Sequence, residues 1–309
     1  MTPAAGNSLD ADVRAMVEGF DATMPAAFHR LGVAGARAAV TALRPTDGEP
    51  VEEVLDRTVE GRHGPIAVRI YRPVDATGAS IVYLHGGGWT MGSIDGCDAV
   101  CRRLANSTLS TVISVEYRLA PEHKYPVPLD DCYDVVVWWV AQQGSGAPIA
   151  VAGDSAGANL AMALCLRARN YNGPRIAAQL LAYPVFGDPR RYESYIEYAD
   201  GPILSSADID WFLRNYINED SDLDNEEVLP SRARTLRGLP PAIVVTAAVD
   251  PLRGSAEAAV AALDEAGVRA QLLRVEGTVH SFFTEVGTLR SADRAVDAVA
   301  EFAREIFAG

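Results

Sequence analysis

The chain has 309 residues, of which 49% are hydrophobic and 22% are charged, which is the composition of an ordinary globular protein. Its 27 basic and 41 acidic side chains give a formal net charge of −14, and a surface of this sign disfavours nucleic acid and anionic lipid as partners. The four cysteines form no CxxC pair and have no clustered histidines beside them, so the sequence indicates neither a zinc site nor a need for disulfides.

The first 45 residues are predicted to form an N-terminal helical segment, divided into short pieces by Pro25, Gly32 and Gly35. Apolar side chains recur there at helical spacing, namely Leu9, Val13, Met16, Val17 and Phe20. This region has no basic leader and no apolar core of signal-peptide length, and no run in the chain approaches a membrane span. We therefore expect a cytoplasmic protein.

Residues 46–309 are predicted to form one α/β catalytic domain, because strand-like and helix-like runs alternate along them. The expected strands, several of them continuous apolar runs, are Ile66–Tyr71, Ile81–Leu84, Val112–Glu116, Ile149–Ala152, Gln179–Tyr183, Ala242–Ala247 and Ala270–Val275. The expected helices are Asp131–Gln142, Ala156–Arg169, Ser255–Ala266 and Ala292–Phe307. This alternation predicts a mostly parallel sheet, buried by helices on both faces.

Residues 186–235 interrupt the alternation and are rich in tyrosine, aspartate and arginine. Ser205 and Asp208 have the spacing of a capping box, which predicts a helix that carries Ile209, Trp211 and Phe212. We interpret this stretch as an insertion over the top of the sheet. With the N-terminal helices it would form a small cap above a pocket.

The sequence Gly153-Asp154-Ser155-Ala156-Gly157 follows one expected strand and opens an expected helix, which is the context of a nucleophile elbow. Such a turn holds the serine in a strained conformation, and its neighbours two residues away must be very small. Ser155 is therefore predicted to be a nucleophile at a helix N-terminus, where developing negative charge is favoured. A chance Gly-Ser-Gly turn is the alternative.

Three glycines, Gly86-Gly87-Gly88, follow the expected strand Ile81–Leu84 and leave their amides unshielded. We predict an oxyanion hole from the amides of Gly87, Gly88 and Ala156, with Gly86 as a further candidate if the loop is rotated. A flexible loop and a phosphate cradle are alternatives, although the run lacks the Lys-Ser/Thr ending of a P-loop. His85 is expected to brace the loop.

His280 is the predicted base, because the triad order in α/β-hydrolases is serine, acid, histidine and no other histidine follows Ser155. The predicted acid is Asp250, just past the strand Ala242–Ala247, which would orient His280 and stabilise its protonated form. Asp264 and Glu276 are competitors, and Asp250 as a plain turn residue is the alternative. His280 itself is expected on a loop after the last strand.

These motifs together resemble the bacterial hormone-sensitive-lipase family (family IV) of α/β-hydrolase esterases over roughly residues 65–305. The residues that carry the resemblance are His85–Trp89, Glu116–His123, Pro126, Asp130, Asp131, Gly153–Asn159, Asp250–Arg253 and His280, and Asp154 is typical of the GDSAG subgroup. The resemblance implies an α/β-hydrolase fold with a small helical cap, hydrolysis of short- to medium-chain acyl esters, no metal or organic cofactor, and a possible homodimer.

The chain departs from the family pattern at Ala248-Val249, Gly254-Ser255 and Ser281. What holds the loop that carries Asp250, called the acid loop below, therefore needs its own explanation. Arg118 and Glu122 are expected to find charged partners, because burying them unpaired is costly. Trp89, Tyr183, Trp211 and Phe212 are candidates for the substrate pocket, with core packing as the alternative for each.

The expected function is a serine carboxylesterase acting through an acyl-enzyme intermediate on a small-molecule ester. An amidase or an acyltransferase would use the same triad. A non-catalytic receptor of this fold is a further alternative, which the presence of His280 disfavours. A peptidase is disfavoured because no separate domain of propeller type governs access.

Overall fold

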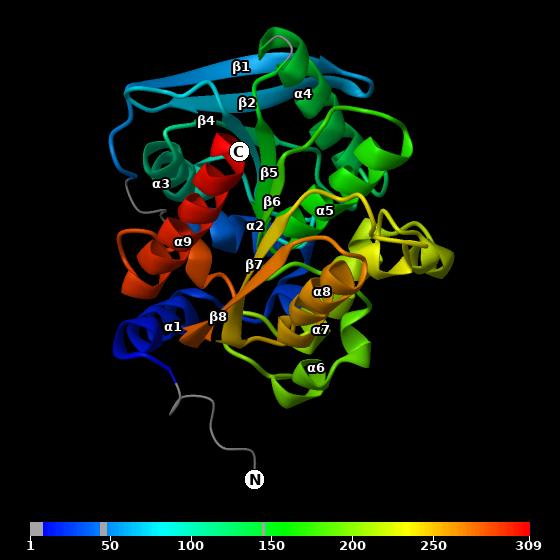
Figure 1. Cartoon of the computed structure of the whole chain (residues 1–309). Helices are drawn as coiled ribbons and strands as arrows, with labels where there is room; N and C mark the ends of the chain where they lie inside the picture. The colour runs from blue at the N-terminus through cyan, green and yellow to red at the C-terminus, as the bar shows by residue number, and fades with distance from the viewer. Residues whose placement is uncertain (1–8, 44–47, 144–145) are drawn as a thin grey trace.

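The computed structural model describes residues 9–43, 48–143 and 146–309. At its centre, these residues form one eight-stranded sheet of order β1-β2-β4-β3-β5-β6-β7-β8 (Figure 1). The strands are β1 (Glu53–Gly61), β2 (Gly64–Arg72), β3 (Ser80–Leu84), β4 (Thr111–Glu116), β5 (Ile149–Asp154), β6 (Ala178–Ala182), β7 (Ala242–Val249) and β8 (Ala270–Val279). β2 pairs antiparallel with β1 and β4, and the remaining pairs are parallel. The predicted α/β fold with a mostly parallel sheet is confirmed.

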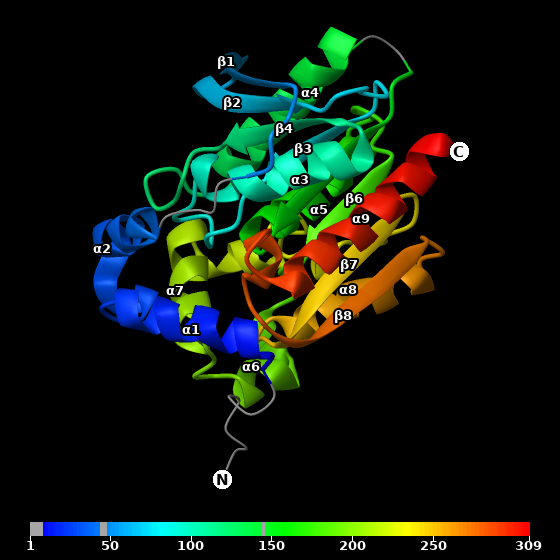
Figure 2. The same cartoon turned by 90° about the vertical axis from the view of Figure 1, so that its left-hand side faces the viewer.

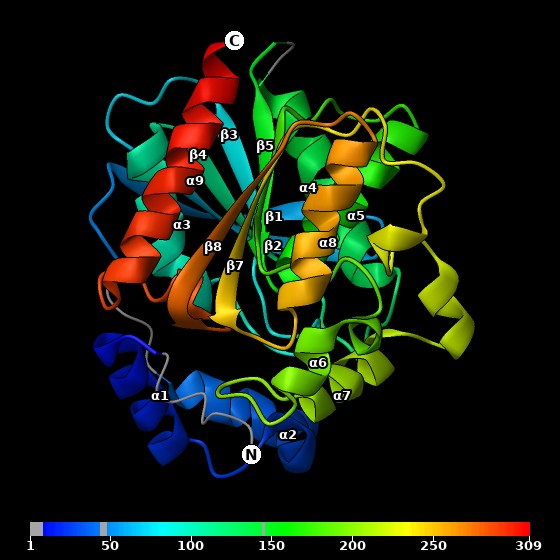
Figure 3. The ribbon, with the colours of Figure 1, turned by 60° about the horizontal axis from the view of Figure 1, so that its bottom comes forward.

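Helices cover both faces of this sheet. α3 (Asp98–Thr108) and α9 (Arg290–Ala308) lie on one face, and α4 (Val127–Gln143), α5 (Ala156–Asn170) and α8 (Arg253–Glu265) lie on the other (Figures 1 and 3). Within β3, Ile81 and Tyr83 belong to the core beneath α3 and α9, whereas Val82 and Leu84 belong to the core beneath α4 and α5. Burial on both faces is why the central strands are continuously apolar.

Four further helices gather at the end of the sheet toward which the parallel strands point (Figures 2 and 3). They are α1 (Ala11–Thr23) and α2 (Phe28–Ala42) from the N-terminal segment, and α6 (Glu193–Glu197) and α7 (Ser206–Tyr216) from the insertion. The predicted capping box of α7 is confirmed, because the Ser205 hydroxyl accepts from the Asp208 amide and the Asp208 carboxylate accepts from the Ser205 amide. In the described part of the chain, no helix is long and apolar enough to cross a membrane.

The sequence patterns missed β1, α3 and the short helix α6, and several boundaries differ, among them α4, which begins at Val127 and not at the expected Asp131. β1 is an edge strand with mostly exposed or half-exposed residues, so it lacks the continuous apolar run that marked the other strands. α3 is amphipathic and was not named. β8 continues to Val279 in place of ending at Val275, so Gly277-Thr278-Val279 is strand and not the expected loop, and His280 follows the strand directly.

Candidate active site

Ser155 lies at the sharp turn between β5 and α5. Its backbone has φ +53° and ψ −118°, and its amide donates to the Ala182 carbonyl across 2.9 Å. A Cβ placed on Gly157 would lie 1.9 Å from the Leu84 oxygen, and one placed on Gly153 would lie 2.6 Å from the same atom. The elbow therefore requires glycine at both positions, and the strained turn projects the hydroxyl from the top of the sheet.

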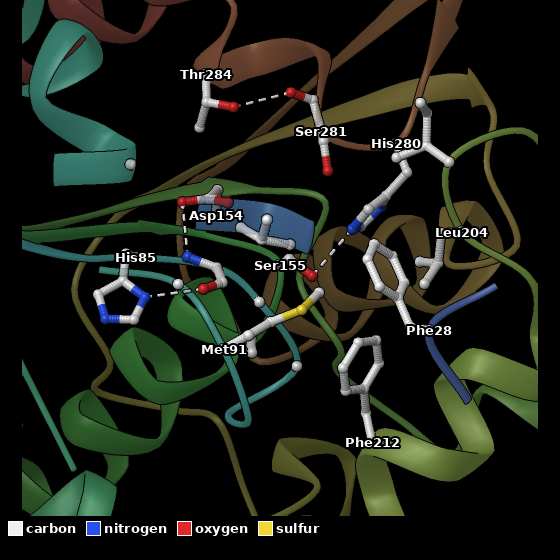
Figure 4. Close-up of a pocket in the computed structure, with 18 of the residues that line it drawn as sticks. Phe28, His85, Met91, Asp154, Ser155, Leu204, Phe212, His280, Ser281 and Thr284 are labelled. Carbon is white, nitrogen blue, oxygen red and sulfur yellow. Dashed lines mark hydrogen bonds between the residues drawn. The ribbon is translucent and has the colours of Figure 1, made fainter. Parts of the chain in front are cut away.

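The structure brings the three predicted triad residues together. His280 Nδ1 lies 2.8 Å from Asp250 Oδ2, and His280 Nε2 lies 3.0 Å from Ser155 Oγ. Figure 4 shows the imidazole directed at the serine hydroxyl. Asp250 is completely buried directly after β7, whereas the competing carboxylates Asp264 and Glu276 are exposed. This geometry lets the histidine take the serine proton while the carboxylate fixes its tautomer.

The acid loop is braced by side chains that the sequence did not single out. Asp250 Oδ1 accepts from the Leu252 amide across 2.7 Å. Ser194, on α6, donates its hydroxyl to the Pro251 carbonyl and accepts from the Gly254 amide, both across 3.0 Å. The insertion therefore holds the loop that carries the acid.

The departures from the family pattern at Gly254 and Ser255 explain this close contact. A Cβ on Gly254 would lie 2.8 Å from the Tyr192 Cβ, so a larger residue would displace α6 from α8. The Ser255 hydroxyl accepts from the amides of Phe186 and Gly187, both across 3.1 Å. Small residues at these positions thus join the acid loop to the start of the insertion.

The glycine loop presents free amides beside Ser155. Within the described ranges, the amides of Gly87, Gly88 and Ala156 donate to no protein acceptor. The Gly86 amide is already used, because it donates to Asp154 Oδ1 across 3.0 Å. In this conformation the Gly86 amide is therefore occupied, whereas the three predicted amides are available to an oxyanion.

Asp154, to which the sequence assigned no role, fixes this loop. Its Oδ1 accepts from the Gly86 amide and from the Tyr83 hydroxyl, the latter across 2.8 Å. Burial raises the pKa of Asp154, and these hydrogen bonds oppose the shift. Asp154 thus anchors the start of the oxyanion loop to the elbow itself.

His85 braces the same loop, as expected. Its Nδ1 donates to the Gly86 carbonyl across 2.8 Å, and its ring stacks on Tyr117 at a centroid distance of 4.2 Å. The Tyr117 hydroxyl donates to the His85 carbonyl across 2.7 Å. Burial lowers the pKa of His85 to about 4, so its ring is neutral near pH 7.

The charged residues of the Tyr117–His123 stretch have the partners that were expected. Arg118 Nη1 lies 2.5 Å from Asp131 Oδ1. Glu122 Oε2 lies 2.7 Å from Arg37 Nη2, on α2. The first pair neutralises a buried carboxylate and the second lies at the surface, where Glu122 is exposed, so neither pair needs a chemical role.

Helix α2 forms hydrogen bonds near both of its ends with residues around the site. Near its C-terminus, Arg37 donates to the Thr90 carbonyl across 2.8 Å and to the Ala120 carbonyl across 2.9 Å. At its N-terminus, the amide and Nδ1 of His29 lie 2.9 and 2.8 Å from Asp208 Oδ1, on α7. The two segments expected to form the cap are therefore joined to each other and to the oxyanion loop.

A cavity of about 370 Å³ opens beside Ser155. Its apolar lining includes Met16, Phe20, Phe28, Val40, Leu43, Met91, Val185, Ile203, Leu204, Ile209 and Leu252. Its polar lining includes Ser93, Ser281, Thr284 and Glu285. In Figure 4, Ser281 and Thr284 lie on the opposite side of Ser155 from Phe212. The cap helices thus supply much of the apolar wall, a role that their helical spacing alone did not reveal.

Two of the four aromatic residues predicted for the pocket line it. Trp89 and Phe212 do so, and Trp89 also stacks on Tyr216 at a centroid distance of 4.5 Å. Tyr183 and Trp211 do not. Tyr183 is completely buried against the His280 ring, at 4.5 Å between centroids, and Trp211 packs against Phe212 at 5.0 Å. These two residues pack against neighbouring rings and do not line the cavity in this structure.

The described residues hold no group of three or more histidine, cysteine, aspartate or glutamate side chains that is placed to bind a metal ion. Around Ser155 the chain itself places a serine hydroxyl, an imidazole, a buried carboxylate and free backbone amides next to one another. These are the parts that acyl transfer through a covalent intermediate requires.

Comparison with known proteins places this site in a family. Residues 81–284 match the family described as alpha/beta hydrolase fold. Esterase LipI of Mycobacterium tuberculosis is 39% identical over 82% of this chain and 83% of its own length, and an arylesterase of Saccharolobus solfataricus is 37% identical over 84% and 85%. A solved esterase of Pyrobaculum calidifontis has a TM-score of 0.84 and 36% identity, covering 96% of this chain and 98% of its own. An α/β-hydrolase enzyme from the metagenome of Lake Arreo has a TM-score of 0.90 and 34% identity, covering 98% and 100%. The chain therefore belongs to the α/β-hydrolase family and, within it, to the esterases related to hormone-sensitive lipase.

Proposed function

We propose that this protein hydrolyses carboxylic esters with short to medium acyl chains, using Ser155, His280 and Asp250 as its catalytic triad. The observation that carries the proposal is the hydrogen-bonded chain from Asp250 Oδ2 through His280 to Ser155 Oγ, with distances of 2.8 and 3.0 Å. Relatives that are named esterase or carboxylesterase align with most of the chain and support the same reaction.

The reaction proceeds in two steps. Ser155 Oγ attacks the ester carbonyl while His280 Nε2 accepts its proton, and the oxyanion binds to the amides of Gly87, Gly88 and Ala156. His280 then gives the proton to the oxygen of the leaving alcohol, which leaves an acyl-enzyme. Water attacks this intermediate by the same route and releases the acid.

The size of the cavity supports small substrates. A volume of about 370 Å³ is near the lower end of typical ligand sites, about 300–1,000 Å³. The apolar wall favours an acyl or alcohol group without charge on that side. Both features favour dissolved esters of modest length over emulsified long-chain lipids.

A series of p-nitrophenyl esters with increasing acyl length tests this proposal. We expect kcat/KM to be greatest at short to medium length and the Ser155→Ala variant to lose nearly all activity, with Ser221→Ala, an exposed serine, as the control. Unaltered activity in Ser155→Ala would exclude the nucleophile. A maximum on long emulsified esters, or comparable turnover of matched amides, would exclude the proposed substrate class.

We also propose that two copies pair along β8, the edge of the sheet farthest from β1. In the described sheet β8 pairs only with β7, and an unpaired strand edge favours pairing with a second chain. Light scattering on a size-exclusion column measures the mass directly. A monomer at high protein concentration would exclude the dimer.

A further inference from the structure

Glu285 places a carboxyl group in the cavity that the proposed mechanism does not use. It follows the short 3₁₀ helix Phe282–Thr284, five positions after His280 in the chain, and it lines the cavity. Burial is the physical cause that raises the pKa of Glu285. In the ranges that the structure describes, its carboxylate has no hydrogen bond and no ion pair.

Glu285 is half-buried, and the more deeply buried acids of the protein contrast with it because they have partners. Asp131 pairs with an arginine, Asp154 accepts two hydrogen bonds at the oxyanion loop, and Asp208 and Asp250 each bind a histidine. Withdrawing a carboxylate from water without a partner is unfavourable. A carboxylate that faces a ligand cavity can recover this free energy from the ligand.

The surroundings of Glu285 indicate which chemical group of a ligand would bind its carboxylate. The cavity residues on its segment, Ser281 and Thr284, are neutral, and no lysine or arginine lines the cavity among the described residues. The protein also carries a net charge of −14, which draws cations toward it. A positively charged group on the substrate therefore meets a favourable potential at Glu285, and no lysine or arginine of the described lining opposes it.

We propose that Glu285 is a specificity-determining residue that binds a cationic ammonium group on the ester substrate. This inference rests on the proposed ester hydrolysis. In a cavity with mostly apolar walls, the attraction between the carboxylate and an ammonium group is screened less than in water. The cation is carried by either the alcohol part or the acyl part of the ester.

The proximity of Glu285 to His280 in the chain favours the alcohol part. His280 Nε2 must reach the oxygen of the leaving alcohol to protonate it. Ser281 and Thr284, from the same segment, lie across Ser155 from Phe212 (Figure 4), so this segment forms a wall distinct from the aromatic one. The experiment below separates the two possibilities.

Two pairs of volume-matched esters test the proposal, each comparing a trimethylammonium group with a neutral tert-butyl group. Acetylcholine and 3,3-dimethylbutyl acetate differ in the alcohol part. The p-nitrophenyl esters of 4-(trimethylammonio)butanoic acid and 5,5-dimethylhexanoic acid differ in the acyl part. In each pair the ratio of kcat/KM, cationic over neutral, measures recognition of the charge separately from the chemistry.

We expect the wild type to prefer the cationic member of at least one pair. Glu285→Gln should lower that ratio about ten- to a hundredfold, equivalent to about 1.4–2.8 kcal/mol, with little change for the neutral ester. Glu276→Gln, which removes the same charge from an exposed position on β8, should keep the ratio. Should Glu285→Gln be poorly folded, Glu285→Met gives a second uncharged side chain of similar length.

The proposal is overturned if the wild type prefers neither cationic ester, if the ratio survives in Glu285→Gln, or if Glu276→Gln lowers it equally. If the wild type hydrolyses neither neutral ester, the proposed function itself is contradicted. The two failures are therefore distinguishable. The pair in which the preference appears identifies the side of the scissile bond that Glu285 faces.

Discussion

Replacing Gly157 with alanine tests the elbow most directly, because the structure fixes how much space a methyl group would need. The added Cβ would lie 1.9 Å from the Leu84 oxygen and 2.5 Å from the His85 oxygen. Ordinary contact begins at 3.4 Å, so α5 and β3 would have to separate by up to 3.4 − 1.9 = 1.5 Å. Both contacts are with backbone atoms, which cannot rotate away as a flexible side chain would.

The expected loss has two parts. Overpacking of this kind costs about 1–3 kcal/mol of the free energy of unfolding. Separation of α5 from β3 also moves the Ala156 amide relative to the Gly86-Gly87-Gly88 loop, and a misplacement of about 1 Å lowers the rate by about a hundredfold. We therefore expect a less stable protein whose kcat falls more than its stability alone would explain.

Denaturant unfolding followed by circular dichroism, together with kcat and KM on a p-nitrophenyl ester, measures both parts. Gly19→Ala is the matched control, because no atom lies within 4 Å of a Cβ placed on this residue of α1. It should leave activity unchanged and stabilise the protein slightly, by about 0.5–1 kcal/mol. Wild-type stability and turnover in Gly157→Ala would refute the close packing of α5 on β3.

Three further predictions concern the groups that orient the site. Asp250→Asn should lower kcat about 10⁴-fold with little change in unfolding, since His280 would lose its favoured tautomer; unchanged kcat would exclude Asp250 as the acid. Arg37→Ala should cost about 1–3 kcal/mol of stability and reduce kcat, because it frees the Thr90 carbonyl; the exposed Arg30→Ala should do neither. Burial lowers the pKa of His85 to about 4, against about 6.5 in the unfolded chain. As the pH falls below 6.5, the unfolded chain therefore takes up a proton that the folded protein does not. The free energy of unfolding should fall by roughly 3 kcal/mol between pH 6.5 and pH 4. In His85→Gln, denaturant unfolding at both pH values should show a smaller loss of stability, by about that amount. A pH dependence equal to that of the wild type would contradict this role of His85.

The sequence could predict the parts of the site that depend on short stretches of chain. The strand, turn and helix around Ser155 are contiguous, and the glycines beside it are required by the turn itself. Asp250 and His280 were predicted from their order in the chain and their positions after apolar strands. Since parallel strands end at one edge of the sheet, such residues tend to meet there.

The orientation of individual side chains could not be predicted in the same way. Tyr183 and Phe212 are both aromatic and both buried, yet Phe212 faces the cavity and Tyr183 packs against His280. A periodic pattern indicates that a residue is buried but not what covers it. The edge strand β1 was missed for a related reason, because its exposed faces leave no apolar run to recognise.

The sequence by itself determined the fold class, the nucleophile turn and the glycine loop, because each follows from local backbone requirements and from the burial of strands. The tertiary structure decided what acts on these parts from a distance. The contacts of Arg37 with the Thr90 carbonyl and of Ser194 with the Asp250 loop join residues more than 50 positions apart, and the packing of the cap helices decides much of the apolar wall of the cavity. Such contacts depend on how whole elements pack, and no local pattern of residues encodes that arrangement.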